Sequence, residues 1–148
     1  MTRWTEAQDA IAAALVADPP TGWVVRPTAG FPGMDVLDTF RAGILWVDDD
    51  METGSFGGET TASDGGVVPI DESFTVTVAA YKASTVSRVA LRDAFAALEL
   101  ALFEVLLGPE FATGPGIDLV LSGRSYKPGL LDERTWDGFY TLTFTWRG

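Results

Sequence analysis

The sequence predicts an α+β protein with a single domain, in which an antiparallel or mixed β-sheet is covered by two helices. Three observations predict this class. Residues 84–107 repeat apolar side chains at helical spacing, residues 73–81 alternate at strand spacing, and the closing segment 136–147 alternates in the same way. The predicted order of elements is α-β-β-β-α-β-β.

Length and composition fit one domain spanning residues 1–148. The chain has 47% hydrophobic and 21% charged residues, enough to bury a core of its own. It contains no cysteine, which excludes disulfides and thiolate metal sites and fits a reducing compartment. The N-terminus lacks the apolar run of a signal peptide and no stretch is apolar enough to cross a membrane, so we expect no membrane partner.

The first third of the chain is expected to supply one helix and two strands. The helix is capped by Thr2 or Thr5 and runs to about Val16, and strands follow at 23–26 and 41–48. The second strand contains a continuous apolar run, which indicates that both of its faces are covered. One face of the helix carries its large apolar side chains: Trp4, Ala7, Ile11 and Leu15.

A glycine-rich segment separates these elements from the middle strand. Residues 51–69 hold five glycines and no periodic pattern, which predicts a long acidic, glycine-rich loop at about 49–70. The strand at 73–81 then places one set of side chains on each face of the sheet. The first set is Phe74, Val76, Val78 and Ala80; the second is Thr75, Thr77, Ala79 and Tyr81.

The long helix is the clearest element of the sequence. We expect it to begin at a cap on Ser84 or Thr85 and to run to about Leu107, where Gly108 and Pro109 end it. Its apolar residues exceed a single stripe, so one face must be covered by the first helix or by a neighbouring subunit. The predicted stripe is Val86, Val89, Phe95, Leu98, Leu102, Val105 and Leu106; Leu91, Leu100, Phe103 and Leu107 lie off it.

Two strands are expected at the C-terminal end. They span about 117–127 and 136–147, with a turn region at 128–134 that makes a hairpin the economical topology. In the last strand one face is apolar and aromatic and the other is rich in threonine. Four of the five tryptophans, at 23, 46, 136 and 146, fall in or beside predicted strands, where a structural role is favoured over a ligand platform.

Charge is strongly negative and unevenly placed. Ten basic and 21 acidic residues give a net charge of −11. Between positions 42 and 81 there are eight acidic residues and no lysine or arginine. Because nucleic-acid affinity comes mainly from phosphate neutralisation by basic residues, stable binding of nucleic acid is not expected, whereas DNA passing without binding is allowed.

The residue types exclude the commonest catalytic machinery. Without histidine or cysteine the chain cannot build the usual serine, cysteine or zinc sites. The glycine-rich stretches match no phosphate loop or dinucleotide fingerprint, so no cofactor is predicted. Asp48, Asp49 and Asp50 form one carboxylate cluster, but adjacent residues of an extended chain point apart, which favours a solvated strand end over a metal site. Paired carboxylates for glycoside chemistry stay open.

Two charged groups are candidates for contacts between subunits. The acidic group is Asp48, Asp49, Asp50 and Glu52. The basic group is Arg124, Lys127 and Arg134, near the predicted hairpin end. The basic group is either a solvated turn or a contact with an acidic patch of the next subunit.

Five segments form a pattern that covers nearly the whole chain. They are the helix TEAQDAIAAALVA, the short strand GWVVRP, the strand ESFTVTVAAY, the helix STVSRVALRDAFAALELALFEVLLG, and the closing WDGFYTLTFTWRG. In pattern, without a signature motif, this layout resembles the tail terminator proteins of long-tailed bacteriophages and, more loosely, the related head-tail joining proteins. The alanine-rich, acidic, cysteine-free composition is similar to that of proteins from phages of high-GC actinobacteria.

This resemblance implies a virion structural protein without enzymatic activity. In that family a homohexameric ring caps the finished tail tube, docks to the head-side connector and lets DNA pass through its lumen. The implied partners are further copies of the chain, the major tail tube protein and the head-tail connector protein. The implied location is the neck of the virion, after assembly in the host cytoplasm. A lumen lined by the acidic group or by the loop would repel the genome.

Other functions remain open from the sequence. A head-tail connector, a head-completion protein or another tail subunit would share the same fold class. A cytoplasmic small-molecule binding domain or enzyme would instead need a deep pocket with converging polar groups. An acidic adaptor that mimics DNA would need carboxylates spaced along an exposed face.

Overall fold

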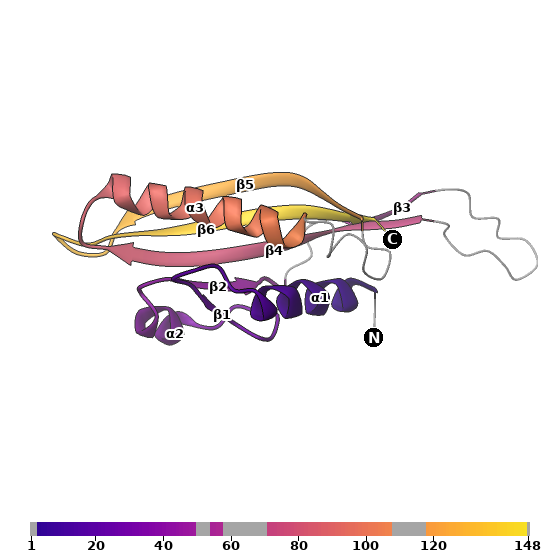
Figure 1. The fold of residues 1–148 in the computed structure, drawn as a ribbon, viewed down its shortest axis with the longest axis horizontal. Helices are drawn as coiled ribbons and strands as arrows, with labels where there is room; N and C mark the ends of the chain where they lie inside the picture. The colour runs from indigo at the N-terminus through magenta and orange to yellow at the C-terminus, as the bar shows by residue number, and fades with distance from the viewer. Residues whose placement is uncertain (1–2, 50–53, 58–70, 108–117, 148) are drawn as a thin grey trace, which may run out of the picture.

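A computed structural model describes residues 3–49, 54–57, 71–107 and 118–147. Within these residues it confirms the α+β class, with a six-stranded sheet and three helices (Figure 1). The elements in chain order are α1 (Arg3–Ala17), β1 (Val24–Val25), α2 (Met34–Thr39), β2 (Ile44–Val47), β3 (Gly54–Gly57), β4 (Asp71–Ser84), α3 (Arg88–Leu106), β5 (Asp118–Leu130) and β6 (Trp136–Arg147).

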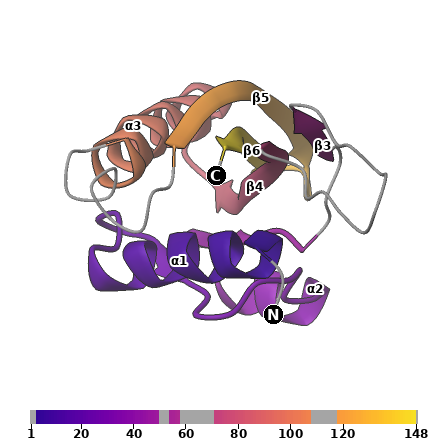
Figure 2. The same cartoon turned by 90° about the vertical axis from the view of Figure 1, so that its right-hand side faces the viewer.

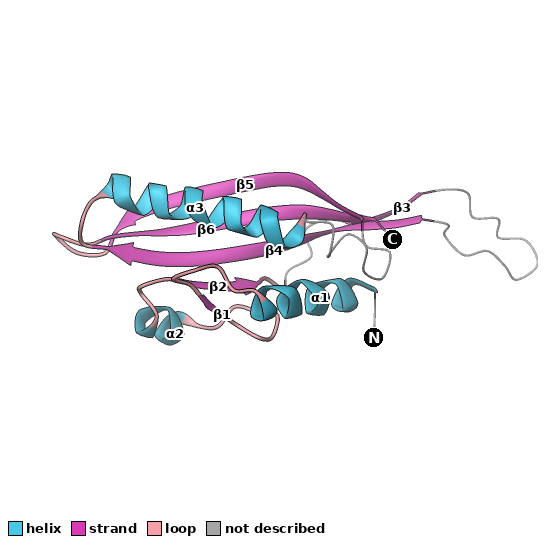
Figure 3. Cartoon of the chain, in the orientation of Figure 1, coloured by secondary structure: helices cyan, strands magenta, loops and turns pink. Residues whose placement is uncertain are grey.

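The sheet is mixed and centres on β4. The strand order is β1-β2-β4-β6-β5, and β3 pairs with the start of β4 on the same edge as β2. Only β1 and β2 are parallel, with α2 in the connection between them. The long strands β4, β5 and β6 extend along most of the described molecule, whereas β1 and β2 are short (Figure 3). β5 therefore forms a long outer edge of the sheet.

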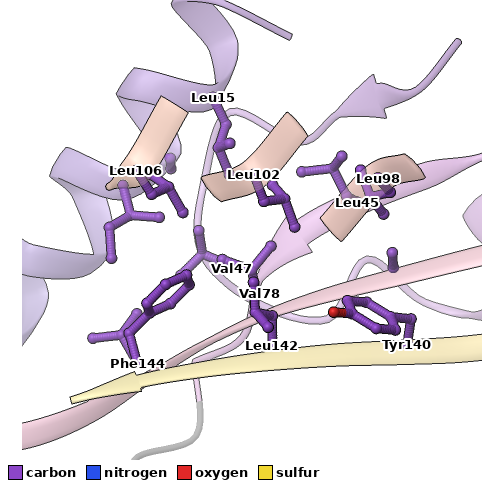
Figure 4. Close-up of a cluster of buried hydrophobic side chains, with 14 of the residues drawn as sticks. Leu15, Leu45, Val47, Val78, Leu98, Leu102, Leu106, Tyr140, Leu142 and Phe144 are labelled. Carbon is purple, nitrogen blue, oxygen red and sulfur yellow. The ribbon is translucent and has the colours of Figure 1, made fainter. Parts of the chain in front are cut away.

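Helices α1 and α3 cover one face of the sheet, as predicted. Figure 2 shows α3 beside β4, β6 and β5, and Figure 4 shows how the side chains from the helices meet those from the strands. Leu15 of α1 and Leu102 and Leu106 of α3 are fully buried over Leu142 and Phe144 of β6. Burying one such leucine contributes roughly 1.5–3 kcal/mol. We call this set of side chains the main core.

The opposite face has a second, smaller cluster. Leu37 of α2 packs with Ile44 and Trp46 of β2 and with Ala79 and Tyr81 of β4. All four residues of β2 are consequently buried, which confirms that both faces of this strand are covered. Over β6 and β5 the same face is rich in threonine, and among the described residues no helix covers it there.

Helix α3 begins later than the sequence predicted. Its N-cap is Ser87, whose Oγ accepts a hydrogen bond of 2.9 Å from the Ala90 N–H, and not Ser84 or Thr85. The reason is that β4 continues to Ser84, which pairs with Trp136 of β6. Tertiary pairing therefore overrides the local capping signal.

The buried stripe of α3 is also corrected. Leu91 belongs to it, together with Phe95, Leu98, Leu102 and Leu106, although the prediction left Leu91 outside. Val86 precedes the helix and is 81% exposed, and Val89 is 54% exposed, although both were predicted inside the stripe. Gly108 and Pro109, the predicted terminators, lie outside the described residues.

Three further boundaries differ from the prediction. Thr5 lies within α1 and does not cap it, and Thr2 is outside the described residues. Helix α2 was missed because six residues are too few for a periodic signal, and its N-cap is Gly33, which has no side chain to mark the start. The predicted loop at 49–70 contains β3, because the start of β4 supplies the pairing that its own sequence does not announce.

Strand β5 continues to Leu130 through Pro128, so the predicted turn region at 128–134 is shorter than expected. A proline is tolerated there because β5 is an edge strand and its outer side needs no backbone donor. Pro128 pairs in register with Gly138, and the connection to β6 occupies residues 131–135. The hairpin itself is confirmed.

Candidate functional site

The described part of the acidic group lies directly after β2. Asp48 is half-buried: its N–H donates to the Thr77 carbonyl, its carbonyl accepts from Gln8 Nε2, and its Oδ1 accepts from the Asp49 N–H. These bonds fix the chain as it leaves the sheet, the local bonding for which aspartate is favoured in turns. Asp49 is exposed, and Asp50 and Glu52 lie outside the described residues.

Arg124 is engaged within its own chain. Its Nη1 donates to both carboxylate oxygens of Glu99 on α3, at 3.0 and 3.1 Å. The Tyr140 hydroxyl donates to Glu99 Oε1 at 2.8 Å. Burial, followed by this hydrogen bond, raises the pKa of Tyr140, and Glu99 raises the pKa of Arg124. The half-buried Glu99 carboxylate thus obtains two donors, and Arg124 ties the outer strand β5 to α3.

The other two basic candidates lie apart from Arg124. Lys127 is paired in register with Phe139, on the threonine-rich face, whereas Arg124 pairs with Leu142 on the helix-covered face. Arg134 lies in the turn between β5 and β6, where its N–H donates to Asp132 Oδ1 at 2.8 Å and so lowers the pKa of that aspartate. The structure therefore does not gather Arg124, Lys127 and Arg134 into one basic surface.

A different pair of arginines lines a hollow that the sequence analysis missed. Arg88 and Arg92 lie one helical turn apart on α3 and, with Val89 and Tyr126 of β5, enclose an open hollow of about 280 Å³. Arg88 lies over the Trp136 ring, 5.3 Å from its centre. The Tyr126 hydroxyl is buried and has no hydrogen-bond partner among the residues that the structure describes. A sequence signal existed: two arginines four residues apart at a helix start, where the helix dipole disfavours cations.

Apolar side chains are exposed on the outer side of α3, next to the exposed Asp93 and Glu104. Leu100 is 64% exposed and Val89 is 54% exposed, and they lie on the same side of the helix because eleven residues make about three turns. Leu107, just past the helix, adds to the same side. Val120 and Leu121 of the edge strand β5 are also exposed. We call Val89, Leu100 and Leu107 the outer α3 face.

Comparisons with known proteins do not name a family for this chain. No protein-family model matches the sequence, and no curated protein matches it. Within the described ranges, no three acidic side chains gather in a way that could hold a metal ion, and no helix is long and apolar enough to cross a membrane.

Proposed function

We propose that the protein is a virion structural subunit of the tail terminator type, which assembles with copies of itself into a ring. The ring caps the tail tube of a long-tailed bacteriophage, contacts the major tail tube protein on one side and the head-side connector on the other, and lets DNA pass through its lumen. The protein acts without catalysis and without a cofactor, in the neck of the virion.

The observation that carries this proposal is the exposure of apolar side chains on the outer α3 face. Leu100 and Val89 stay exposed although the main core is already filled from α1 and α3. Exposed apolar side chains on one side of a helix, bordered here by Asp93 and Glu104, are typical of a surface that another protein covers. Each side chain of this size contributes roughly 1.5–3 kcal/mol when fully covered, so a few of them stabilise an interface measurably.

The charge distribution supports passage of DNA through such a ring. The chain carries a net charge of −11, and Asp49 is exposed at the end of β2. Carboxylates that face a lumen repel phosphates and so prevent the genome from binding to the wall. A head-tail connector subunit would use the same features, and the two roles differ in which end of which partner the ring binds.

The first test is the oligomeric state of the purified protein. Multi-angle light scattering over a range of concentrations should detect a closed oligomer, and electron microscopy should show rings. Leu100→Glu should abolish the oligomer, because it places a charge in the covered surface. Met34→Glu is the matched control: Met34 is 63% exposed, like Leu100, but lies on α2 across the sheet. A protein that is monomeric at high concentration and forms no ring would contradict the proposal.

The second test concerns the partner. Because rings of this kind can require their partner to assemble, the protein should also be added to tail tubes of the same phage. We expect labelled protein at the head-proximal end of the tubes. Binding only to filled heads would favour the connector role, and binding to neither would overturn both.

A further inference from the structure

We propose that the hollow formed by Arg88, Val89, Arg92 and Tyr126 receives the carboxylates of Glu6 and Asp9 from a second copy of the chain. The contact joins the start of α3 in one copy to the start of α1 in the next. It rests on the self-assembly proposed above and specifies which surfaces meet.

Arg88 and Arg92 are unfavourable for the stability of the helix that carries them. Like charges four residues apart repel, and cations near the N-terminus of a helix are disfavoured by its dipole. Within the described residues neither arginine forms a salt bridge, and Arg88 lies over the face of the Trp136 ring. The neighbouring Tyr126 hydroxyl is buried and has no hydrogen-bond partner in the described part of the chain. Two guanidinium groups and a phenol that all lack an acceptor converge on one hollow, which is suited to carboxylates.

The exposed side of α1 offers the complementary chemistry. Glu6, Asp9, Ala13 and Val16 are exposed and follow one another at helical spacing, so they share one side of the helix. Neither acid pairs with a base among the described residues. The order along α1 is two acids and then an apolar residue, and the order along α3 is two arginines and then the exposed Leu100. At about 1.5 Å per residue, Asp9 to Val16 spans about 10 Å and Arg92 to Leu100 about 12 Å.

The two surfaces point to different ends of the molecule. In Figure 1, α3 begins at the left end of the long axis, whereas α1 begins towards the right. If each copy uses its two surfaces on two different neighbours, the contact is heterologous and joins unlike surfaces of successive copies. Such contacts close into rings when the rotation between copies allows it, which is the form of assembly that the proposed function needs.

Charge reversal tests the contact directly. The double variant R88E/R92E should weaken self-association about tenfold or more, and E6R/D9R should weaken it comparably, because each leaves like charges facing one another. Mixing the two variants should restore association, since each supplies the surface that the other needs. The matched control is R26E/R41E, which changes the net charge by the same amount at sites outside the hollow and outside both candidate contact groups, and should leave association unchanged. R88Q/R92Q, with circular dichroism, separates loss of contact from loss of fold.

The outcomes separate this inference from the proposed function. If the wild-type protein never self-associates, alone or on tail tubes, the proposed function fails. If it associates and R88E/R92E associates equally well, or if the mixture does not recover, only the inferred contact fails. Binding of a short DNA duplex that depends on Arg88 and Arg92, with association unaffected, would likewise overturn it in favour of a phosphate site.

Discussion

The two faces of the sheet are filled to different degrees, although they share the same strands. On one side α1 and α3 cover β4 and β6 with large side chains such as Leu102 and Phe144. On the other side α2 covers only β2 and the adjoining end of β4, through Leu37. The face covered by α1 and α3 therefore contributes most of the folding free energy. Much of the opposite face has no helix over it among the described residues.

The sequence of β4 and β6 encodes this difference. On the helix-covered face the strands present Val78, Leu142 and Phe144, which are fully buried or nearly so. On the opposite face they present Thr77 and Thr143, whose hydroxyl oxygens lie 3.1 Å apart. Threonine satisfies strand preference while keeping a polar group for each side chain, so it suits a face that is only partly covered.

The largest effect is expected in the main core. Phe144→Ala should lower the free energy of unfolding by about 3–5 kcal/mol, because Phe144 is fully buried and its removal leaves a cavity between α3 and β6. Urea unfolding followed by circular dichroism measures this loss. A loss below about 1 kcal/mol would mean that the face is less tightly packed than the contacts indicate.

A smaller loss is expected on the opposite face. Leu37→Ala should cost about 2–3 kcal/mol, near the lower end for a buried leucine, because its cluster is small and lies beside the surface. The same urea experiment applies, with Met34→Ala on the exposed side of α2 as the control. If Leu37→Ala cost as much as Phe144→Ala, the ranking of the two faces would be wrong.

Tyrosines with a raised pKa lie on both faces, Tyr81 on the α2 side and Tyr126 and Tyr140 on the side of α1 and α3. Burial, followed by the hydrogen bond to Asp137, raises the pKa of Tyr81 to about 12, and the pKa of Tyr140 is raised on the other face. Because the folded-state pKa exceeds the unfolded value, the stabilisation is fully present below about pH 10 and is lost as pH rises towards about 12. We expect the titration of Tyr81 to lower wild-type stability by about 1–2 kcal/mol over that range.

Single substitutions divide this alkaline loss between the faces. Tyr81→Phe should remove the part from the α2 side and leave the part from Tyr126 and Tyr140. Urea unfolding midpoints of the wild type and of Tyr81→Phe, each measured at about pH 9 and about pH 11.5, give the slope of stability against pH for the two proteins. A Tyr81→Phe protein with the same slope as wild type would show that Tyr81 titrates normally.

The elements that the sequence predicted correctly are those with a long internal pattern. The alternation in β4 and β6 identified both faces of the sheet, and the run from Ile44 to Val47 identified a strand buried on both sides. The errors lie in elements whose existence or length depends on a strand that is distant in the sequence. β4 extends to Ser84 because β6 pairs with it, β3 forms because β4 pairs with it, and β5 passes through Pro128 because its outer side is free.

The candidate site was less predictable for the same reason. Residue spacing could not reveal that Arg124 bonds to Glu99, which is twenty-five residues away on α3. Nor could it reveal that Tyr126 of β5 lies beside Arg88 and Arg92. The one local signal was the arginine pair at a helix start, which is unfavourable for the helix alone and so indicated a partner outside it.

The smallest expected effect tests the threonine-rich face itself. Thr77 is 5% exposed, and the Thr143 hydroxyl is its neighbour across the strands. Thr143→Val should cost about 1–2 kcal/mol, because it leaves the buried Thr77 hydroxyl without this partner. The double variant T77V/T143V should recover most of that loss, since removing both hydroxyls leaves no unpaired polar group and keeps the β-branched shape. Additive losses in this double-mutant cycle would mean that the two hydroxyls do not interact, and the face would then be a set of independent solvated side chains.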